Sequence, residues 1–342
     1  MNFKILFNFS ASRIGGGYKR LYEYSNYFNN INGAYFIIHP DCSTLIDEFQ
    51  NNTYILIKQN YFQRIILDFR YVNSLIINYH IDVYYSYGIA FNKSFAKINI
   101  LHLSNILPFE SFKYGNGIVQ KIKMSLLSSL LKNTFKYTDI ISAESNSTFK
   151  YINNQWSNKF LISTNGNDDE INNYGNIYQY DNTAVIIGTY SYKNIKDSII
   201  VYNYLKNTTS KDLKLYIIGD KKFLPSNIYN DKNITCLGLL PRSDVINLLK
   251  KSKFYISTTL LENSYNAAAE GLFLSNESFI SDIEPHFELV NSYKYNILDL
   301  NTLNCSIIHV KKKDIQINNL KKWETIIHEL ISNIEKKLKY DK

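Results

Sequence analysis

Short apolar segments alternate with segments of helical periodicity along most of the chain, and this alternation constrains its fold more than any other feature. In the second half, apolar runs are separated by polar loops or amphipathic stretches, and the runs lie at 184–188, 213–219, 234–238 and 254–257. Strands that alternate with helices build parallel sheets that are covered by helices on both faces. The pattern therefore predicts an α/β protein.

The length of 342 residues predicts more than one domain, since single cores rarely grow beyond about 250–300 residues. A polar stretch that starts near Asn165 is typical of a linker between two alternating halves. We expect a first Rossmann-like domain at 1–165, a linker at 166–182, a second Rossmann-like domain at 183–317 and a terminal helix at 318–342.

The segment from Phe254 to Val290 contains the main candidate site. It predicts a buried strand, a polar loop that carries Glu262, and a helix from about Asn266 to Leu274 that carries Glu270. Glu262 follows the carboxyl end of a strand, where open α/β sheets bind their ligands. Glu270 is placed to accept hydrogen bonds from two vicinal hydroxyls, as a carboxylate does when it holds a ribose.

The same helix is expected to begin with an anion site. Asn263, Ser264 and Asn266 are residue types that cap helices, and the first N–H groups of a helix attract phosphate. A phosphate next to a ribose is therefore the predicted ligand of this segment.

The segment from Glu262 to Glu270 resembles the donor-binding signature of retaining GT-B glycosyltransferases, most closely that of glycosyltransferase family 4. The resemblance implies two Rossmann-like domains that face each other across a cleft, and a last helix that crosses back to the first domain. It also implies that Glu262 lies beside the donor sugar and that Glu270 binds the ribose of a nucleotide diphosphate sugar. Many relatives have Gly-Phe-Gly after the first glutamate, whereas this chain has Asn263-Ser264-Tyr265 there. The donor contacts implied here are Asn263, Ser264, Tyr265 and Asn266.

A second loop, from Gly188 to Lys193, is similar to the family loop in which an Arg and a Lys neutralise the diphosphate. Lys193 occupies the position of the Lys, whereas Thr189 stands where the Arg is expected. Gly188, Thr189 and Lys193 are thus implied donor contacts. The residues that remain as substitutes for the missing cation are Lys196, Lys221, Arg13 and Arg242.

Two further candidates come from the first half. Gly16 and Gly17 follow the first predicted strand, where they either approach the donor phosphates and acceptor closely or form a simple tight turn. His102 ends a strand predicted at 97–103, and the segment after it resembles an element of some family members. This implies a contact of His102 with the donor sugar or the acceptor hydroxyl; the alternative is a buried structural histidine.

The net charge of +8 favours an anionic partner. Nucleic acid is not expected, because the sequence contains no RNA-binding aromatic signature and no helix-turn-helix. The stretch 119–137 predicts an amphipathic helix with lysines around it, which either packs in the core or lies on anionic lipid. No apolar run reaches the ~18 residues of a transmembrane helix. We expect a cytoplasmic protein, and in the second of the two alternatives the helix contacts the cytoplasmic face of the inner membrane.

The hypothesis that results is a retaining, metal-independent glycosyltransferase. It would move a sugar from a nucleotide diphosphate sugar to a growing, lipid-linked bacterial surface glycan such as lipopolysaccharide O-antigen or capsule, with Glu262, His102 and Lys193 as catalytic residues. No cofactor is expected, because Lys193 and a helix N terminus would replace a metal ion, and the nearest acidic cluster, 168–170, belongs to the linker. Two alternatives stay open: a catalytically silent GT-B subunit that scaffolds a partner transferase, and a nucleotide-sugar epimerase or phosphorylase on the same fold.

Overall fold

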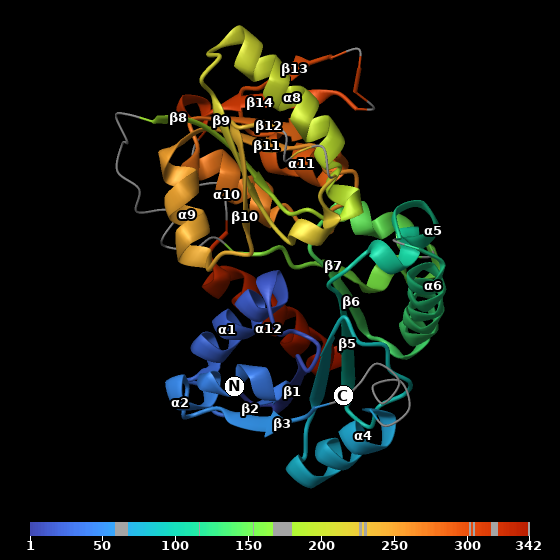
Figure 1. Ribbon diagram of the computed structural model, residues 1–342. Coiled ribbons are helices and arrows are strands. Elements are labelled where there is room, and N and C mark those ends of the chain that lie inside the picture. The colour runs from blue at the N-terminus through green and yellow to red at the C-terminus, as the bar shows by residue number, and fades with distance from the viewer. Residues whose placement is uncertain are drawn as a thin grey trace. The chain divides into compact units, whose positions relative to one another are not determined.

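The computed structural model describes residues 1–58, 68–115, 117–152, 154–166, 180–225, 228, 231–300, 302–303, 305–315 and 321–340. The chain divides into two compact units, and each is built around one sheet (Figure 1). The first unit comprises Met1–Gly166 and Lys321–Lys342, and the second comprises Asn167–Leu320. Most of the linker expected at 166–182, including its acidic cluster, lies outside the described residues.

The first unit contains a seven-stranded sheet in the order β3-β2-β1-β4-β5-β6-β7, in which all the neighbouring pairs are parallel. Its strands are β1 (Ile5–Asn8), β2 (Ala34–Ile38), β3 (Thr53–Leu56), β4 (Val83–Tyr87), β5 (Ile98–Leu103), β6 (Ile140–Ala143) and β7 (Phe160–Ile162). Its α-helices are α1 (Gly15–Phe28), α2 (Thr44–Glu48), α4 (Asp68–Tyr79), α5 (Ser111–Tyr114), α6 (Gly117–Thr134) and α12 (Trp323–Tyr340).

Helices bury both faces of this sheet, which explains the continuous apolar runs of its strands. In β1, Ile5 and Phe7 belong to the core cluster that also holds residues of α1, α2 and α12. Leu6 points to the other face, into the cluster that holds residues of α4 and α6. Because successive side chains of a strand point to opposite faces, a strand buried on both sides is apolar throughout.

The last helix, α12, packs in the core of the first unit. Trp323, Ile327, Leu330 and Ile334 are buried in the same cluster as β1 and α1. The predicted return of the terminal helix to the first domain is thus confirmed, and the helix begins at Trp323.

The second unit has a sheet in the order β10-β9-β8-β11-β12-β14-β13. It is parallel from β10 to β12, and β14 and β13 extend it in the antiparallel sense, an edge that the sequence did not predict. Its strands are β8 (Asp181–Ile187), β9 (Lys214–Ile218), β10 (Ile234–Gly238), β11 (Ser252–Ser257), β12 (Glu277–Ser281), β13 (Asn296–Leu298) and β14 (Ile307–Lys311). Its α-helices are α8 (Ile195–Thr208), α9 (Arg242–Lys251), α10 (Asn266–Leu274) and α11 (Glu284–Val290).

Both faces of the second sheet are also covered. Ala184 and Ile186 of β8 pack with residues of α8. Val185, between them, packs with residues of α9, α10 and α11. The loops that leave the carboxyl ends of β8 and β11 therefore emerge between the two helical layers, at the edge where such sheets bind ligands.

Candidate functional site

Two loops meet at the carboxyl ends of the neighbouring parallel strands β8 and β11. The N–H of Leu260 donates to the carbonyl of Tyr192 at 2.8 Å, and the hydroxyl of Thr259 donates to the same carbonyl at 3.2 Å. These bonds fix the loop after β11 against the loop after β8. They bring together Lys193 and Glu262, which lie 69 positions apart in the sequence.

Lys193 and Glu262 form an ion pair between Nζ and Oε1, with only 14% and 19% of the two side chains exposed. The alkyl chain of Lys193 lies over Gly188, where a Cβ would approach Cε of the lysine to 2.9 Å. Gly188 also has a φ of 92°, a conformation that favours glycine. Gly188 is therefore required for the position of Lys193, and its contact with a donor stays a prediction.

Thr189, at the position where the resemblance has an arginine, is buried. Its hydroxyl donates to the carbonyl of Asp220 at 2.9 Å. Its side chain packs so closely on Gly219 that a Cβ at that glycine would lie 2.7 Å from it. Thr189 thus joins two loops of the second unit and supplies no charge.

Arg242 and Glu270 form a second ion pair, between the first residue of α9 and the middle of α10. Four residues were candidates for the missing cation. Among the ion pairs of the described residues, only that of Arg242 holds one of these four against α10. Arg13 belongs to the first unit, where it lies 3.5 Å from Asp41. An ionised carboxylate has about four lone-pair sites, so pairing with Arg242 leaves Glu270 able to accept from hydroxyls.

Helix α10 begins at Asn266, as predicted, but the prediction of its cap is wrong. The N-cap residue is Tyr265, and it forms no side-chain cap hydrogen bond. The hydroxyl of Ser264 donates to Oδ1 of Asn266 at 2.9 Å, and Asn263 is buried in the loop. The first-turn N–H groups of a helix have no intrahelical partners, and the phosphate site expected at this end stays a prediction.

His286 is a buried residue of this region whose environment the sequence did not indicate. Its Nδ1 lies 2.8 Å from the carbonyl of Ser281 and must carry a proton there, because a carbonyl only accepts. Nε2 is then an acceptor, and it has no hydrogen-bond partner among the described residues. Burial, with the charge of Lys193 acting in the same direction, lowers the pKa of His286 to about 4. Glu284, at the start of α11, is by contrast exposed.

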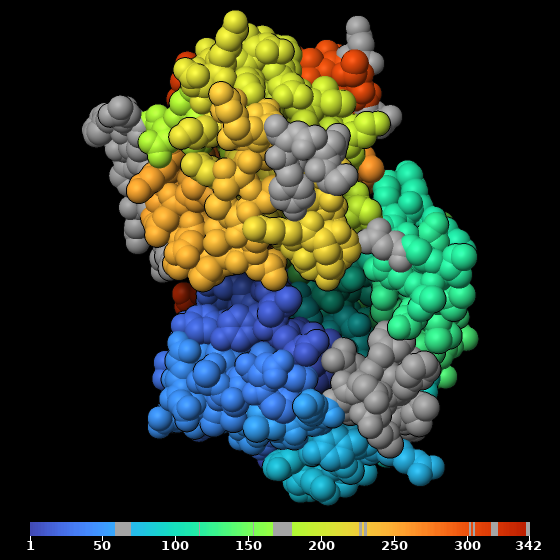
Figure 2. All heavy atoms as spheres, viewed as in Figure 1, coloured from blue at the N-terminus to red at the C-terminus, as the bar shows by residue number. Residues whose placement is uncertain are grey.

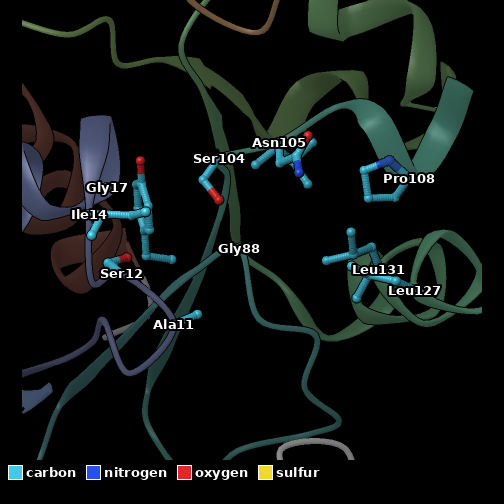
Figure 3. Close-up of a pocket in the computed structure, with 12 residues that line it drawn as sticks. Ala11, Ser12, Ile14, Gly17, Gly88, Ser104, Asn105, Pro108, Leu127 and Leu131 are labelled. Carbon is cyan, nitrogen blue, oxygen red and sulfur yellow. The ribbon is translucent and has the colours of Figure 1, made fainter. Parts of the chain in front are cut away.

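The first unit has its own cavity, of about 300 Å³, at the carboxyl ends of β1, β4 and β5 (Figure 3). The lining combines polar side chains, from the segment after β1 and from the segment after β5, with an apolar wall near α6. The polar side chains are Ser12, Ser104 and Asn105, and the apolar wall consists of Pro108, Leu127 and Leu131. The cavity therefore suits a ligand with a hydroxylated part and an apolar part.

The glycines predicted to approach a ligand form the first turn of α1. Gly17 lines the cavity, and a Cβ there would lie 3.1 Å from Oγ of Ser12 and 3.3 Å from the ring of Tyr87. Gly16 is exposed and does not belong to the lining. Close packing within the unit thus accounts for Gly17, and the contact of either glycine with a ligand stays a prediction.

His102 is completely buried behind the cavity. Its ring stacks on that of Tyr87, which lines the cavity, with 4.9 Å between centroids. Nδ1 lies 2.9 Å from Oγ of Ser142, whereas Nε2 is 3.5 Å from Oε1 of Glu144, too far for an ordinary hydrogen bond. His102 does not reach the cavity in this structure, so its contact with a substrate stays a prediction.

Glu144 is balanced by Arg20, a fully buried arginine that the sequence analysis missed. Nη2 of Arg20 lies 3.8 Å from Oε1 of Glu144. It donates to the carbonyls of Ser163 and Thr164, each at 2.8 Å, and to Oδ1 of Asn165 at 3.1 Å. These acceptors are 143 to 145 positions away, so no local pattern marks them.

Burial and mutual contacts together fix the charges of Arg20, Glu144 and His102. Burial alone would raise the pKa of Glu144, but its contact with His102 and the charge of Arg20 hold the pKa below its usual value. Burial, together with the charge of Arg20, lowers the pKa of His102 to about 4. The group therefore consists of a cation, a carboxylate and a neutral imidazole at neutral pH.

In the described part of the chain, no group of three or more His, Cys, Asp or Glu residues is placed to hold a metal ion. The acidic cluster 168–170 lies outside that part, and metal independence stays a prediction. Among the described helices, none combines the length and apolarity needed to cross a membrane.

Several solved structures that the chain resembles are glycosyltransferases of the GT-B type. HepE from Anabaena, solved in complex with UDP and glucose, matches with a TM-score of 0.58 and 14% identity, over 84% of this chain and 83% of that chain. WaaG, a glycosyltransferase involved in lipopolysaccharide biosynthesis, matches with a TM-score of 0.61 and 11% identity, over 84% of each chain. A glycosyltransferase from Rickettsia africae matches with a TM-score of 0.55 and 16% identity, over 85% of this chain and 82% of that chain.

No protein-family model matches the sequence, and no curated protein matches it. The evidence from comparison is thus structural, and at these identities it concerns the architecture. With two α/β units of this topology and a terminal helix in the first unit, the chain has the GT-B fold that its sequence predicted.

Proposed function

We propose that this protein is a retaining glycosyltransferase that moves a sugar from a nucleotide diphosphate sugar to a hydroxyl of a growing, lipid-linked surface glycan. The observation that carries the proposal is the pair Lys193–Glu262, a cation and a carboxylate held together where β8 and β11 end, shortly before α10 begins. A solved structure of the same fold is HepE in complex with UDP-glucose, which supports a UDP-sugar as the first donor to test.

Lys193 and the start of α10 would bind the diphosphate. This group gains negative charge as it leaves, so cations and N–H dipoles directed at it stabilise the transition state more than the ground state. In the structure Lys193 is neutralised by Glu262. Donor binding would give the lysine a phosphate partner and release Glu262 to accept hydrogen bonds from the hydroxyls of the sugar.

Glu270 would hold the ribose, with Arg242 fixing the orientation of its carboxylate. Residues of the loop between the two glutamates would complete the donor contacts, and these are Asn263, Ser264, Tyr265 and Asn266. Gly188 and Thr189 would contribute through the conformation of the other loop, which positions Lys193.

The cavity of the first unit would take the acceptor. Its polar side suits a glycan hydroxyl, and its apolar wall suits the neighbouring part of a lipid-linked carrier. Tyr87 lines this cavity, and His102 and Glu144 would act on the acceptor through that tyrosine. A role in lipopolysaccharide or capsule synthesis is the corresponding proposal for the pathway, and the resemblance to WaaG supports it.

The test is thermal unfolding of the pure protein with UDP, GDP, CMP or dTDP, first without metal and then with Mg²⁺. A ligand at about 100 times its dissociation constant stabilises the folded state by about 2.7 kcal/mol, which gives a clear shift of the midpoint. We expect one nucleotide to give this shift without metal. We expect Glu270→Gln to abolish it, while Arg242→Ala, the matched control, weakens it only in part. If no nucleotide shifts the midpoint under either condition, the donor site is refuted.

A catalytically silent GT-B subunit is the second candidate, because a buried threonine stands in place of the expected cation at position 189. Donor hydrolysis separates the two proposals. Slow release of nucleotide diphosphate by the wild type, abolished in Glu262→Ala, favours the enzyme. Nucleotide binding without any hydrolysis or transfer favours the silent subunit.

A further inference from the structure

We propose that the cavity of the first unit binds an uncharged sugar residue of the acceptor and discriminates against sugars that carry a carboxylate or a phosphate. The inference rests on the acceptor role proposed above, and it adds the chemical class of the acceptor. Three observations carry it: polar side chains that have no partners, an apolar wall, and the lack of charge among the described residues of the lining (Figure 3).

Two serine hydroxyls of the lining have no hydrogen-bond partner among the described residues. Ser12 follows β1 and is only 5% exposed, and Ser104 follows β5. Next to Ser104, Oδ1 of Asn105 accepts from the N–H of Leu107 at 2.8 Å, and the NH2 group of Asn105 has no partner in the described part of the chain. A hydroxyl both donates and accepts, and an amide NH2 donates twice. The lining therefore offers donors and acceptors that match the hydroxyls of a sugar.

Two glycines leave the space in which these hydroxyls lie. A Cβ at Gly88 would lie 2.1 Å from Oγ of Ser104, and the φ of 70° at Gly88 also favours glycine. A Cβ at Gly17 would lie 3.1 Å from Oγ of Ser12. Both hydroxyls thus lie against the main chain, which limits their movement. A ligand that forms hydrogen bonds with them therefore loses little free energy in ordering them.

An apolar wall completes the lining. It consists of Pro108, Leu127 and Leu131, which lie on the right in Figure 3, across from Ser12 and Gly17. A pyranose ring has hydroxyls around its edge and C–H groups on its faces, so it can bind to the serines and contact this wall at the same time. The volume of about 300 Å³ lies at the lower end of the range of ligand pockets, about 300–1,000 Å³, and suits a single sugar residue.

The lining offers no compensation for a negative charge. None of its described residues is charged. Two cations of the neighbouring segment pair with acidic residues: Arg13 lies 3.5 Å from Asp41, and Nζ of Lys19 lies 2.7 Å from Oε1 of Glu23. A carboxylate or phosphate in the cavity would therefore lose its hydration without gaining a cation, which is strongly unfavourable. An uncharged sugar only exchanges hydrogen bonds with water for hydrogen bonds with the lining.

Tyr87 increases this discrimination. It lines the cavity, and its hydroxyl donates to Oε1 of Glu144 at 3.3 Å. The phenolic proton is thus directed to the carboxylate behind the cavity, and an anionic ligand cannot use it. The phenolic oxygen can still accept a hydrogen bond from a sugar hydroxyl, which has a proton to donate.

The test is the binding of methyl glycosides to the full-length protein without nucleotide, measured by saturation-transfer NMR. Two pairs differ only in the group at the last carbon of the sugar: methyl glucoside and methyl glucuronide, and methyl galactoside and methyl galacturonide. We expect at least one neutral glycoside to bind about tenfold or more tightly than its acid, because the acid buries a charge without a partner. Equal affinities within both pairs, tighter binding of an acid, or no binding of any of the four would overturn the proposal.

A cation in the apolar wall should reverse the preference. In Leu127→Lys, we expect the acid to bind more tightly than the neutral sugar. Leu126→Lys is the matched control, since Leu126 is 48% exposed and does not line the cavity. It belongs to α6, whose outer side contributes to the green surface of the first unit in Figure 2. This variant has the same net charge and should keep the preference of the wild type. If the two variants behave alike, the net charge of the protein sets the preference and the proposal is wrong.

Removal of the hydroxyls tests the polar part of the lining. Ser12→Ala and Ser104→Ala should each weaken the binding of the neutral sugar about threefold to tenfold, because each removes one hydrogen bond. Ser25→Ala is the matched control and should leave the affinity unchanged, since Ser25 is buried in the same unit and does not line the cavity. An unchanged affinity in both cavity variants would place the sugar elsewhere and refute the proposal.

Failure of this inference can be distinguished from failure of the proposed function, because the nucleotide-dependent shift in unfolding midpoint is measured separately. If a nucleotide gives the shift and no sugar shows the expected preference, the acceptor class is wrong and the donor site stands. If the neutral sugars bind as expected and no nucleotide shifts the midpoint, the cavity is a sugar site and the proposed transferase function is wrong.

Discussion

Replacement of Arg20 by methionine should destabilise the first unit by several kcal/mol. The side chain of Arg20 is fully buried and donates to two main-chain carbonyls, each at 2.8 Å. Methionine fills much of the same space and brings neither the charge nor the donors. Glu144, of which only 6% is exposed, would lose the cation next to it.

The size of this loss of stability follows from the removal of one charge of the Arg20–Glu144 pair while the other remains. Removing one partner of a buried ion pair costs about 3–5 kcal/mol, because the other charge stays buried and uncompensated. Arg13 provides the matched control, since its pair with Asp41 is 3.5 Å long and both side chains are more than half exposed. Arg13→Met should therefore cost only about 0–1 kcal/mol.

Tryptophan fluorescence during urea unfolding is a suitable assay. The chain has two tryptophans, Trp156 and Trp323, and both belong to the first unit. Their emission therefore reports the unfolding of that unit without a contribution from the second.

A double variant tests the reasoning. Arg20→Met with Glu144→Gln should lose less stability than the sum of the two single variants, because the uncompensated charge is then absent. If Arg20→Met costs no more than Arg13→Met, or if the two single costs simply add, the account of a compensated buried charge is refuted.

Three further predictions concern the site and the core. Glu262→Gln should strengthen nucleotide diphosphate binding several-fold, because the paired lysine becomes available, while transfer falls by about 10²-fold or more; unchanged transfer would refute the proposed role. His102 and His286 each have a pKa of about 4 in place of 6.5, so the unfolded chain takes up protons first as the pH falls. Stability should be constant above pH 6.5 and fall by about 2 kcal/mol per histidine between pH 6.5 and 5, and a flat profile by urea unfolding would contradict the burial argument. Gly271→Ala should lower the free energy of unfolding by about 1–3 kcal/mol, because a Cβ there would lie 2.1 Å from the Tyr255 ring. Tyr255→Leu in the same chain should restore part of the lost unfolding midpoint.

Strands such as β9 and β11 were predictable because most of their residues are buried between two helical layers. The apolar run at 213–219 contains β9, and the run at 254–257 lies within β11, each within two residues of the predicted ends. The antiparallel edge was not predicted. Residues of β13 are half-exposed or exposed, so its sequence carries little apolar signal, and only its pairing with β14 makes it a strand.

The candidate site was partly predictable. The sequence placed Lys193 and Glu262 on loops after two strands, and the parallel order of β8 and β11 brings the loops together. It gave no sign that Arg242 pairs with Glu270, because two helices must first pack before those side chains meet. The cap of α10 was mispredicted for a similar reason, since the side chain of Ser264 bonds to Asn266 instead of capping the helix.

The burial of α12 in the first unit has a consequence for the order in which the protein folds during synthesis. Trp323, Ile327 and Leu330 belong to the same core as residues of β1, although about three hundred positions separate them along the chain. Every residue of the second unit leaves the ribosome before these three do. The second unit can therefore complete its core first, while the first unit exposes the apolar surface that α12 will cover. Chaperones should bind the nascent protein at that surface, and proteases should cleave it there. The docking of α12 should therefore determine the yield of folded protein.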